Sequence, residues 1–333
     1  MAVPILSARD VEAAVSPTEA YDAVRHAFVA YARGEWSMPP KIYITNYPWG
    51  DFRAMPALGG GHALLKWVTS FPGNPARGLP TVTGLVLLSD AENGRLLAVL
   101  DAATVTALRT AAAAVLAAET LGRPDASSHA VVGCGVNGAE TARMFVARGA
   151  KPLVWDVEES RRCAVADRLG VEVARSADEA LSCDVVATVT PGFEVLYGPG
   201  SLRPGQHVSL MGADGPGKAE VAIEELRRAR LFCDEWEQVG PNGTPERPRL
   251  RLFCDEWQQA SHGGELTGAV EAGFTRREDV TQLGDVLAGA AGGRQHRDDI
   301  TLFDSTGLAI QDLAIAKVAL AKAAELDLQA LEL

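Results

Sequence analysis

The stretch VVGCGVNGAE, residues 131–140, decides the fold that we expect for this chain. It places Gly133, Gly135 and Gly138 in the spacing GxGxxG, after a short apolar run and before an amphipathic segment. A second apolar run ends in Asp156, about 20 residues further on, as a dinucleotide-binding unit requires. Gly133 would permit the tight turn, and Gly135 would let the backbone approach a pyrophosphate. The alternative is a strand-to-helix turn that binds nothing.

The segments around this loop follow the rhythm of strand, helix and strand from Ala130 onward. Apolar runs such as KPLVWD, VEVA, DVVATVT and QHVSLMG alternate with amphipathic segments such as EESRRCAVADRLG. Short, nearly continuous apolar strands are typical of a parallel sheet that helices cover on both faces. We therefore predict an α/β fold with a Rossmann-type doubly wound parallel sheet, in a dinucleotide-binding domain over residues 121–303.

The residues before and after this domain have a different pattern. Residues 8–34 repeat apolar side chains at helical spacing, and residues 41–101 form short apolar or alternating runs separated by Gly, Pro, Asn and Asp. These patterns predict helices followed by a mainly antiparallel sheet. One long helix is expected from Asp304 onward, and it must pack back on an earlier part. We therefore predict an N-terminal α+β domain, completed by the C-terminal helix, over residues 1–120 and 304–333.

Composition limits the partners and compartments that we expect. The net charge is −12, the sequence pI is about 5.0, and no run of Lys and Arg occurs, which disfavours nucleic acid. The start of the chain lacks the pattern of a signal peptide, and the longest alanine-rich run, residues 110–118, is too short to span a membrane. We expect a cytoplasmic protein. Its five cysteines form no CxxC pair, and no metal site is predicted from the spacing of His, Cys and acidic residues.

Three cations interrupt apolar runs: Arg53 in DFRAMPAL, Lys66 in ALLKWV, and Arg109 in an alanine-rich helix that we expect Asp101 to cap. A buried charge without a partner is costly, so an anion should meet them. Arginine suits a carboxylate through its two-pronged guanidinium, whereas lysine is a point charge whose pKa can be tuned. The alternatives for each cation are a side chain that reaches solvent or an internal ion pair.

Asp214 is the candidate for proton transfer. It lies in MGADGPGK, after the predicted strand QHVSLMG, and ligands of open α/β sheets bind at the carboxyl ends of strands. A carboxylate there can accept or donate a proton, although DGPG is also a common turn. His62 and His262 lie in glycine-rich loops, where a histidine is more often solvated than catalytic.

Four blocks of the sequence together resemble the ornithine cyclodeaminase/μ-crystallin family. In chain order they are GLPTVTGLVLLSDAENGRLLAVLDAATVTALRTAAAAVLAAETL, VVGCGVNGAE, MGADGPGK and TLFDSTGLAIQDLA, and the resemblance covers nearly the whole chain. It implies a homodimer formed through the N-terminal sheet domain, and hydride transfer between NAD(P) and the α-carbon of an amino or imino acid. It also implies that Arg53, Lys66 and Arg109 bind the substrate carboxylate and that Asp214 is the acid/base residue. Lys66 is further expected to stabilise charge at the reacting carbon or amine.

We expect the cofactor to contact residues at the strand ends and in the helix that carries Arg109. These residues are Thr110, Gly133, Gly135, Val136, Asn137, Gly138, Asp156, Thr188, Val189 and Thr190. Asp156 would accept hydrogen bonds from the adenosine ribose and repel a 2′-phosphate, so NAD is expected in preference to NADP. Arg161 and Arg162 lie close in sequence and would weaken that preference if they faced the ribose.

The segment FRAMP departs from the pattern of true ornithine cyclodeaminases. In those enzymes, which this chain resembles, an acidic residue just before MP would hold the distal ammonium of ornithine. In the matching segment this chain has Arg53 nearby. A cation there would repel a second ammonium, so cyclisation of ornithine or lysine is disfavoured. Arg53 instead resembles the alanine dehydrogenase-like branch. Lys41 adds a possible fourth cation, which raises a dicarboxylic imine such as iminosuccinate as a hypothesis.

Two other functions stay open from the sequence. A cyclic ketimine reductase would use the same Asp214 and the same carboxylate-binding residues, with a larger apolar pocket. A non-catalytic binding protein of the μ-crystallin type would hold the cofactor and turn nothing over. The presence of Lys66, Arg109 and Asp214 together disfavours the second function, because a binding protein does not need a proton shuttle.

The seven residues RLFCDEW occur twice, at residues 230–236 and 251–257. Each copy predicts the end of a buried strand, and two copies are too few for a repeat architecture. A metal site built from both copies is disfavoured, because alternating strand residues face opposite ways. We interpret the repeat as a tandem duplication within residues 228–258, and the sequence leaves open which copy joins the sheet.

Overall fold

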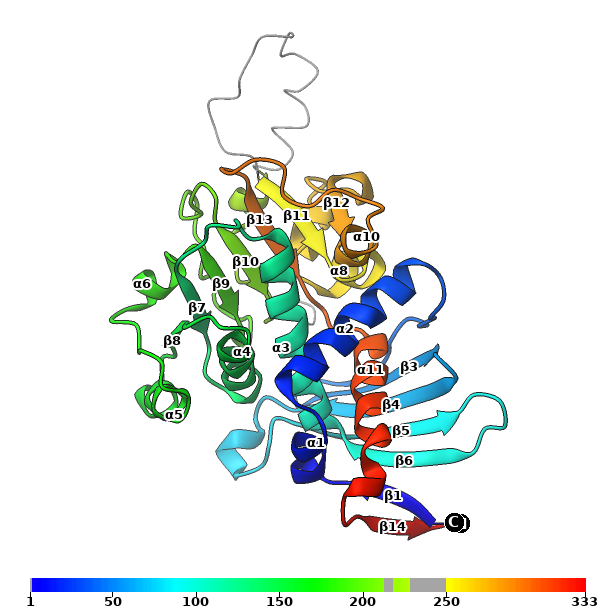
Figure 1. Ribbon diagram of the computed structural model, residues 1–333. Coiled ribbons are helices and arrows are strands. Elements are labelled where there is room, and N and C mark those ends of the chain that lie inside the picture. Colours follow the sequence, from blue (N-terminus) through cyan, green and yellow to red (C-terminus); the bar gives the residue numbers. More distant parts are fainter. Residues whose placement is uncertain (1, 213–217, 228–249) are drawn as a thin grey trace. The chain divides into compact units, whose positions relative to one another are not determined.

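The computed structural model describes residues 2–212, 218–227 and 250–333 (Figure 1). The chain forms two compact units, one of Met1–Ala112 with Leu308–Leu333 and the other of Ala113–Gly307. Each unit contains its own seven-stranded sheet. The glycine-rich loop belongs to the second unit. That the first unit binds substrate and forms a dimer, and that the second binds NAD, stays a prediction.

The sheet of the first unit has the strand order β14-β1-β6-β5-β4-β3-β2. β1 pairs in parallel with β6, and the other neighbours are antiparallel. The mainly antiparallel sheet expected from residues 41–101 is therefore confirmed. The strands are β1 (Ala2–Leu6), β2 (Ile42–Asn46), β3 (Gly50–Gly59), β4 (His62–Ser70), β5 (Val82–Asp90), β6 (Leu96–Asp101) and β14 (Gln329–Glu332).

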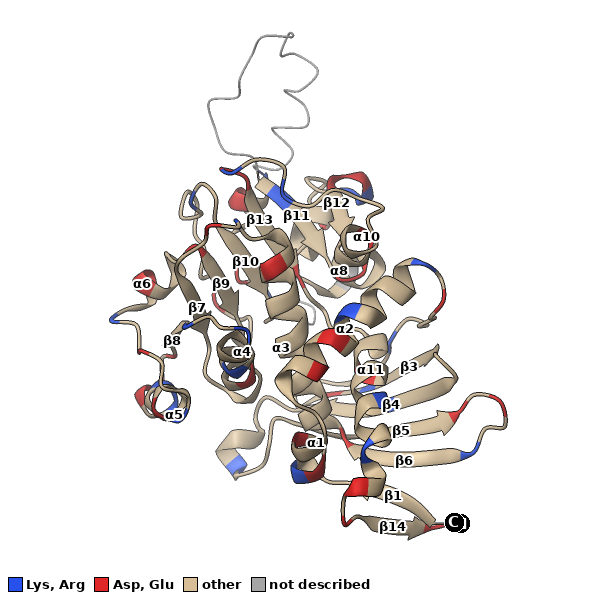
Figure 2. Cartoon of the chain, viewed as in Figure 1, with Lys and Arg blue, Asp and Glu red and all other residues tan. Residues whose placement is uncertain are grey.

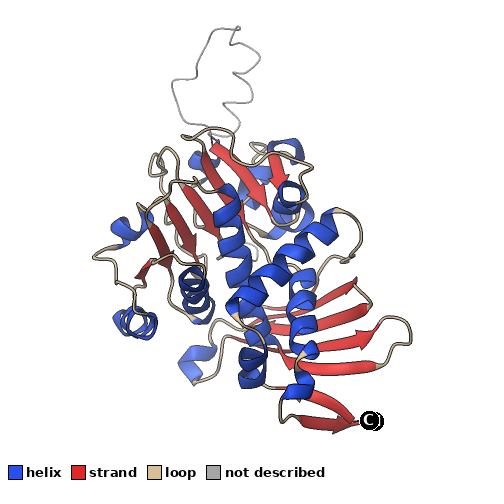
Figure 3. Ribbon diagram, viewed as in Figure 1, coloured by secondary structure: helices blue, strands red, loops and turns tan. Residues whose placement is uncertain are grey.

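Helices of the first unit pack against its sheet (Figure 3). α11 contacts α2 and the strands β3, β4 and β5, and α1 contacts β1 and β6. Both N-terminal helices begin with a capping box, in which Ser7 exchanges hydrogen bonds with Asp10 and Ser16 with Glu19. The helices are α1 (Ala8–Ala14), α2 (Pro17–Ala32) and α11 (Ala309–Ala321), with short 3-10 turns at Asn74–Arg77 and Ala323–Glu325.

The two faces of this sheet differ in burial. The face that carries Lys66 is buried and also includes Met55, Ala57, Leu64, Val68, Val86 and Leu88. The opposite face exposes large apolar side chains, namely Ile42, Ile44, Leu58, Leu65, Trp67 and Leu85. Successive strand residues point to opposite faces, so the run ALLKWV places Lys66 inside and Trp67 outside. The strands carry few charges along their lengths (Figure 2), which makes a buried strand lysine unusual.

α3 (Ala102–Leu121) follows β6 directly, and the division between the two units falls within it. Asp101 begins this helix as expected, because its carboxylate accepts hydrogen bonds from the N–H and hydroxyl groups of Thr104. The helix is longer than the alanine-rich run of residues 110–118, and by length and composition alone it could cross a membrane. However, 78% of its most apolar window is buried inside the protein, as in the core helix of a folded domain.

The sheet of the second unit has the strand order β12-β11-β13-β10-β9-β7-β8, and its neighbours are all parallel. The Rossmann-type α/β fold is therefore confirmed. The strands are β7 (His129–Val132), β8 (Leu153–Trp155), β9 (Val185–Thr188), β10 (His207–Leu210), β11 (Leu250–Cys254), β12 (Val280–Gln282) and β13 (Ile300–Asp304). The helices are α4 (Val136–Ala147), α5 (Glu159–Leu169), α6 (Ala177–Leu181), α8 (Trp257–Gly263), α9 (Thr267–Glu271) and α10 (Leu283–Leu287), with a 3-10 turn at Arg277–Asp279.

The end of the chain differs from the single long helix expected from Asp304 onward. Asp304 is the last residue of β13, because the apolar run ITLFD pairs with β10 and β11 and is buried. The helix α11 starts only at Ala309, and the final strand β14, which was not predicted, pairs with β1. The predicted strand VEVA was also wrong, since it makes only one isolated bridge, between Val173 and Val154.

The second copy of RLFCDEW holds a place in the sheet. Its residues 251–254 lie in β11, between β12 and β13. Asp255 follows the strand, and its carboxylate accepts hydrogen bonds from the backbone N–H groups of Thr306 and Gly307, each at 2.7 Å. The first copy, residues 230–236, lies outside the described residues.

Candidate functional site

The glycine-rich loop joins β7 to α4 in the second unit. Gly133 has a φ of 100°, which glycine adopts without strain, and a Cβ there would lie 2.4 Å from the carbonyl oxygen of Val189. A Cβ on Gly138 would lie 1.7 Å from the carbonyl oxygen of Gly133. At Gly135, by contrast, a Cβ would meet nothing within 4 Å. The loop is therefore closely packed where the fold requires it and open at the residue that a pyrophosphate would approach.

The first turn of α4 is suited to an anion. Its N-cap is Gly135, which provides no side chain to accept hydrogen bonds from the first N–H groups of the helix. The helix dipole adds partial positive charge at the same end. Val136 and Asn137 open the helix, and Val136 is 74% exposed. Val157, just beyond β8, is 88% exposed, so apolar surface is available there for a flat ring such as adenine.

Asp156 follows β8, and its carboxylate supports the glycine-rich loop. Its two oxygens accept hydrogen bonds from the backbone N–H groups of Cys134, at 2.7 Å, and Glu158, at 2.8 Å. Each carboxylate oxygen has two lone pairs, so capacity remains for ribose hydroxyls. The two arginines that could meet a 2′-phosphate have other partners. Arg161 pairs with Glu158 at 2.9 Å, and Arg162 donates to the carbonyl of Asp156 at 2.8 Å.

The strand order reverses between β7 and β9, and such a switch point is where the carboxyl ends of parallel strands enclose a ligand. Thr188 ends β9 and Thr190 follows shortly after it. Both hydroxyls donate to the carboxylate of Glu220, each at 2.6 Å. Glu220 also accepts from the N–H of Gly212, beyond β10. Glu220 was not predicted, since a glutamate at the start of AEVAIEEL looks like any helix glutamate until its partners are known.

Three other buried acidic residues, Glu265, Asp255 and Asp304, lie near Glu220 at this edge of the sheet. Glu265 accepts hydrogen bonds from the N–H groups of Glu220 and Val221, and Asp255 and Asp304 follow or end neighbouring strands. Burial raises the pKa of Glu265 to about 7 and the pKa of Asp304 well above its usual range. Within residues 2–212, 218–227 and 250–333, no group of three or more His, Cys, Asp or Glu could hold a metal ion.

Arg53 and Lys66 lie on the same face of the first unit's sheet. Met55 on β3 is opposite Lys66 on β4, and Arg53 is opposite Val68, so the two cations are diagonal neighbours. Lys66 is only 1% exposed. The alternative that its side chain reaches solvent is therefore wrong, because strand alternation directs it toward the face that α11 contacts.

Lys66 contacts two side chains from other elements. Its ammonium donates to the hydroxyl of Thr106 on α3, at 2.6 Å, and to the carboxylate of Asp312 on α11, at 3.0 Å. The Nε atom of Arg109, also on α3, lies 3.4 Å from the same Asp312 oxygen. Burial lowers the pKa of Lys66 to about 8, an effect that Asp312 opposes and Arg109 strengthens. Two cations therefore converge on one carboxylate.

Some buried polar atoms in this cluster lack hydrogen-bond partners among the described residues. They are Nε of Arg109, Nε2 of Gln311 and Oδ2 of Asp312. Buried polar atoms are nearly always hydrogen-bonded, so three atoms without a hydrogen bond in one place are consistent with a polar ligand there. Asp312 was not predicted as a site residue. It ends the block DSTGLAIQD, but its contact with Lys66 depends on how α11 packs.

Arg53 is held in an ion pair. Its Nε atom lies 2.6 Å from the carboxylate of Asp51, and its guanidinium lies over the ring of Tyr43, 5.4 Å from the centroid. The internal ion pair, which the sequence left open as an alternative, is therefore present. Lys41 lies just before β2 and is half-buried.

The other predicted residues are dispersed or not described. Thr110 is buried in α3, and Val189 donates its N–H to the carbonyl of Val132 at the end of β7. His62 is the first residue of β4, and its ring hydrogen-bonds to the carbonyl of Gly60 in the turn before that strand. Asp214, predicted as the acid/base residue, and the side chain of His262 lie outside the described part of the chain.

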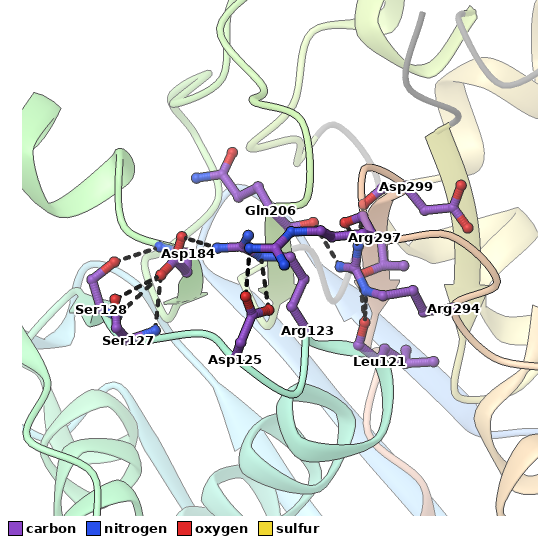
Figure 4. Close-up of polar contacts among 11 residues, drawn as sticks. Leu121, Arg123, Asp125, Ser127, Ser128, Asp184, Gln206, Arg294, Arg297 and Asp299 are labelled. Carbon is purple, nitrogen blue, oxygen red and sulfur yellow. Dashed lines mark hydrogen bonds and ion pairs between the residues drawn. The ribbon is translucent and has the colours of Figure 1, made fainter. Parts of the chain in front are cut away.

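A separate network of charges lies at the amino-terminal edge of the second unit's sheet (Figure 4). Arg294 donates to the backbone carbonyls of Leu121 and Asp299, and Arg123 pairs with Asp184 at 2.7 Å. Asp184 and Asp299 precede strands rather than follow them. Ligands of parallel sheets bind at the opposite edge, so this network stabilises the fold.

Comparison with known proteins finds the same family that the sequence blocks resemble. Residues 2–326 match the model of the ornithine cyclodeaminase/mu-crystallin family. The chain is 40% identical to an alanine dehydrogenase from Archaeoglobus fulgidus over 322 residues, which cover 94% of this chain and 93% of that protein. A solved archaeal alanine dehydrogenase dimer with bound NAD has a TM-score of 0.88 and 37% identity, and the match covers 100% of this chain and 99% of that one.

Two further solved structures share the fold at lower identity. The Delta(1)-pyrroline-2-carboxylate reductase of Thermococcus litoralis, in complex with NADH and L-proline, has a TM-score of 0.86 and 26% identity over 99% of this chain and 100% of that chain. The iminosuccinate reductase of Paracoccus denitrificans, in complex with NAD+, has a TM-score of 0.84 and 26% identity over 100% of both chains. These proteins are named for different substrates, so the likeness of fold does not select one substrate for this chain.

Proposed function

The chain belongs to the ornithine cyclodeaminase/mu-crystallin family, and we propose that this NAD(H)-dependent oxidoreductase transfers hydride between nicotinamide and the α-carbon of a small amino or imino acid. In the reducing direction the reaction is reduction of an imine or reductive amination of a 2-oxo acid. In the oxidising direction it is oxidation of the amino acid.

The buried cluster of Lys66, Arg109 and Asp312 carries this proposal. Two cations share one carboxylate, so the cluster can accept one more negative charge when Lys66 is protonated. A ligand carboxylate would supply hydrogen-bond acceptors to Nε of Arg109 and Nε2 of Gln311, which have no hydrogen bond among the described residues. The site therefore suits a small acid bound through its carboxylate.

Holding the carboxylate fixes the position of the α-carbon. Lys66 lies on a strand and Arg109 on a helix, so regular structure holds their charged groups in place. Because the bound acid is then held in a fixed orientation, its reaction becomes effectively unimolecular. NADH, when bound at the glycine-rich loop, supplies the hydride. Asp214, directly or through a water, gives a proton to the nitrogen in the reducing direction and takes it in the other. Lys66 also stabilises charge at the reacting carbon or amine.

NAD(H) is the preferred cofactor over NADP(H). The support is the carboxylate of Asp156, which follows β8 and keeps acceptor capacity for the ribose hydroxyls while its charge would repel a 2′-phosphate. Arg161 and Arg162 are engaged with Glu158 and with the backbone of Asp156, which removes the main argument against this preference. Thr110, Gly133, Gly135, Val136, Asn137, Gly138, Thr188, Val189 and Thr190 complete the proposed cofactor site.

The substrate is a 2-oxo acid with ammonia, or the matching imine, as for an alanine dehydrogenase. The 40% identity to such an enzyme supports this choice over iminosuccinate. Asp51 neutralises part of the charge of Arg53, and the dicarboxylate hypothesis depended on surplus positive charge. Arg53 and Lys41 remain proposed contacts of the substrate, and Arg53 still disfavours a substrate with a distal ammonium such as ornithine.

A cyclic ketimine reductase is the second candidate function. Its support is the likeness of the fold to a reductase whose complex holds NADH and L-proline, at a TM-score of 0.86. The same cluster would hold the carboxylate of a ring imine. A cofactor-binding protein without activity is less well supported, because it would not need the cluster of Lys66, Arg109 and Asp312.

The protein forms a homodimer through the outer face of the first unit's sheet. This face exposes Ile42, Ile44, Leu58, Leu65, Trp67 and Leu85, each at least 40% accessible. Contiguous exposed apolar surface on a sheet marks an interaction site, and a solved archaeal relative is a dimer. Partners other than a second copy and small anionic substrates are not proposed.

A panel of substrates tests the proposed function by NADH absorbance. Pyruvate with ammonia, oxaloacetate with ammonia, pyruvate with methylamine, and pyrroline-2-carboxylate form the panel. We expect pyruvate with ammonia to oxidise NADH. Activity with the cyclic imine alone would select the ketimine reductase, and inactive oxaloacetate would end the dicarboxylate hypothesis. NADH binding without turnover of any acid would contradict the proposed function.

A further inference from the structure

We propose that Asp312 is a positioning residue that keeps Lys66 protonated and directed at the substrate carboxylate, an inference that rests on the function proposed above. Asp312 is fully buried in the first turn of α11. Its Oδ1 atom lies 3.0 Å from Nζ of Lys66 and 3.4 Å from Nε of Arg109. One carboxylate thus fixes two of the cations that would hold the substrate.

A hydrogen bond from Lys66 to a substrate, in addition to its present ones, requires the protonated form. Its Nζ atom donates to Asp312 and to the hydroxyl of Thr106, and that hydroxyl donates its own hydrogen to the carbonyl of Ala102 at 2.6 Å. A neutral amine has two N–H bonds, and both are used by these contacts. Only the ammonium has a third N–H for a substrate carboxylate. Lys66 therefore binds that carboxylate while keeping its present partners only when it carries a proton.

The other surroundings of Lys66 disfavour this proton. Burial, the guanidinium of Arg109 on α3 and that of Arg53 on β3 all oppose a positive charge there. Thr106 and Val86, from α3 and β5, add no charge. Asp312 is the one carboxylate in contact with Lys66 among the residues that the structure describes. Without it, Lys66 would lose its proton at a lower pH, and the substrate would lose one of the two cations that meet Asp312.

The protonation of Lys66 can be measured without turnover. The chain has six lysines, so protein labelled with ¹³C at lysine Cε gives few signals, and Lys66→Arg identifies the one from Lys66. We expect the titration midpoint of Lys66 in Asp312→Asn to fall by about one to three pH units relative to the unsubstituted protein. Asp312→Glu keeps the charge and should keep most of the original midpoint. An unchanged or higher midpoint in Asp312→Asn would overturn the proposal.

Kinetics give a second, independent readout. Since Lys66 must be protonated in the free enzyme, kcat/KM for the 2-oxo acid should fall as pH rises through its pKa, and Asp312→Asn should move this fall to lower pH. An equal loss of kcat/KM at every pH would show that Asp312 is only structural and would overturn the proposal. NADH binding verifies that each variant is folded, and Asp312→Ser replaces Asp312→Asn if the latter does not fold. If the enzyme turns over no acid, the proposed function fails, while the lysine titration still decides the role of Asp312.

Discussion

Lys66 and Asp312 lie 3.0 Å apart, Nζ to Oδ1, although 246 residues separate them in the chain. The ion pair joins β4 to the first turn of α11, and Arg109 of α3 meets the same carboxylate oxygen. Removing one partner of a buried ion pair leaves an uncompensated charge, which typically costs about 3–5 kcal/mol. Two buried cations meet one carboxylate here, so one positive charge stays uncompensated when Lys66 is protonated. An anionic ligand would compensate this charge.

The carboxylate of Asp156 is expected to select the cofactor. In Asp156→Asn the shape is kept and the negative charge is lost, so repulsion of a 2′-phosphate disappears. We predict that affinity for NADPH relative to NADH rises by about tenfold, which is about 1.4 kcal/mol. Fluorescence titration with each nucleotide measures this ratio. Asp167→Asn, an exposed change on α5, is the control, and an unchanged ratio in Asp156→Asn would remove Asp156 from this role.

Glu220 is expected to hold the threonines at the end of β9. Glu220→Ala removes the carboxylate to which the hydroxyls of Thr188 and Thr190 donate, so this part of the proposed cofactor site loosens. We predict that the Kd for NADH rises by about tenfold. The exposed neighbour Glu224 provides a matched control, since Glu224→Ala should bind NADH normally. Equal affinities of the two variants would show that this contact has no part in cofactor binding.

The network around Arg294 is expected to contribute to stability and not to activity. Arg294→Lys loses most of the hydrogen bonds to the carbonyls of Leu121 and Asp299, and we predict a loss of about 3 kcal/mol in the free energy of unfolding. Denaturant unfolding measures this value. The neighbouring Arg297, whose side chain is 70% exposed in its ion pair with Asp125, is the control, and Arg297→Lys should cost less than about 1 kcal/mol.

The duplicated segment gives a deletion test. Removing residues 229–249 takes out the first copy of RLFCDEW and the spacer, and it leaves Leu250–Cys254, the whole of β11, in place. We predict a folded protein that binds NADH with unchanged affinity, measured by circular dichroism and fluorescence titration. Loss of cofactor binding would mean that both copies are needed.

The sequence was sufficient to predict the elements whose signals are local. The spacing of Gly133 and Gly135, together with the apolar runs around them, predicts the parallel sheet. The signals for a strand, for the turn after it and for the start of the next helix all lie in neighbouring residues. The alternation in ALLKWV likewise places Lys66 inside the first unit. Local signals also failed where two elements adjoin. The apolar run ending at Asp304 was merged with the helix that follows it, although pairing on both sides makes it a strand.

The partners of the predicted site residues could not be found in this way. Asp312 and Glu220 have no distinguishing local pattern, since each is an acid near the start of a helix. Their roles come from contacts with Lys66 and Thr188, made by elements distant in the chain. A charge in an apolar run predicts that a partner exists, but the packing of helices on sheets decides which residue it is.

The transfer of hydride to an α-carbon is tested most directly with NADH that carries deuterium at both hydrogens of nicotinamide C4. The enzyme is incubated with this NADH, ammonia and pyruvate, or with whichever acid of the panel is consumed fastest, and the amino acid product is analysed by mass spectrometry. We predict one deuterium on the α-carbon of every product molecule. We predict no product when the Lys66→Met or the Arg109→Met variant is used in place of the unsubstituted enzyme. An amino or imino acid product without deuterium, or consumption of deuterated NADH without such a product, would contradict the account.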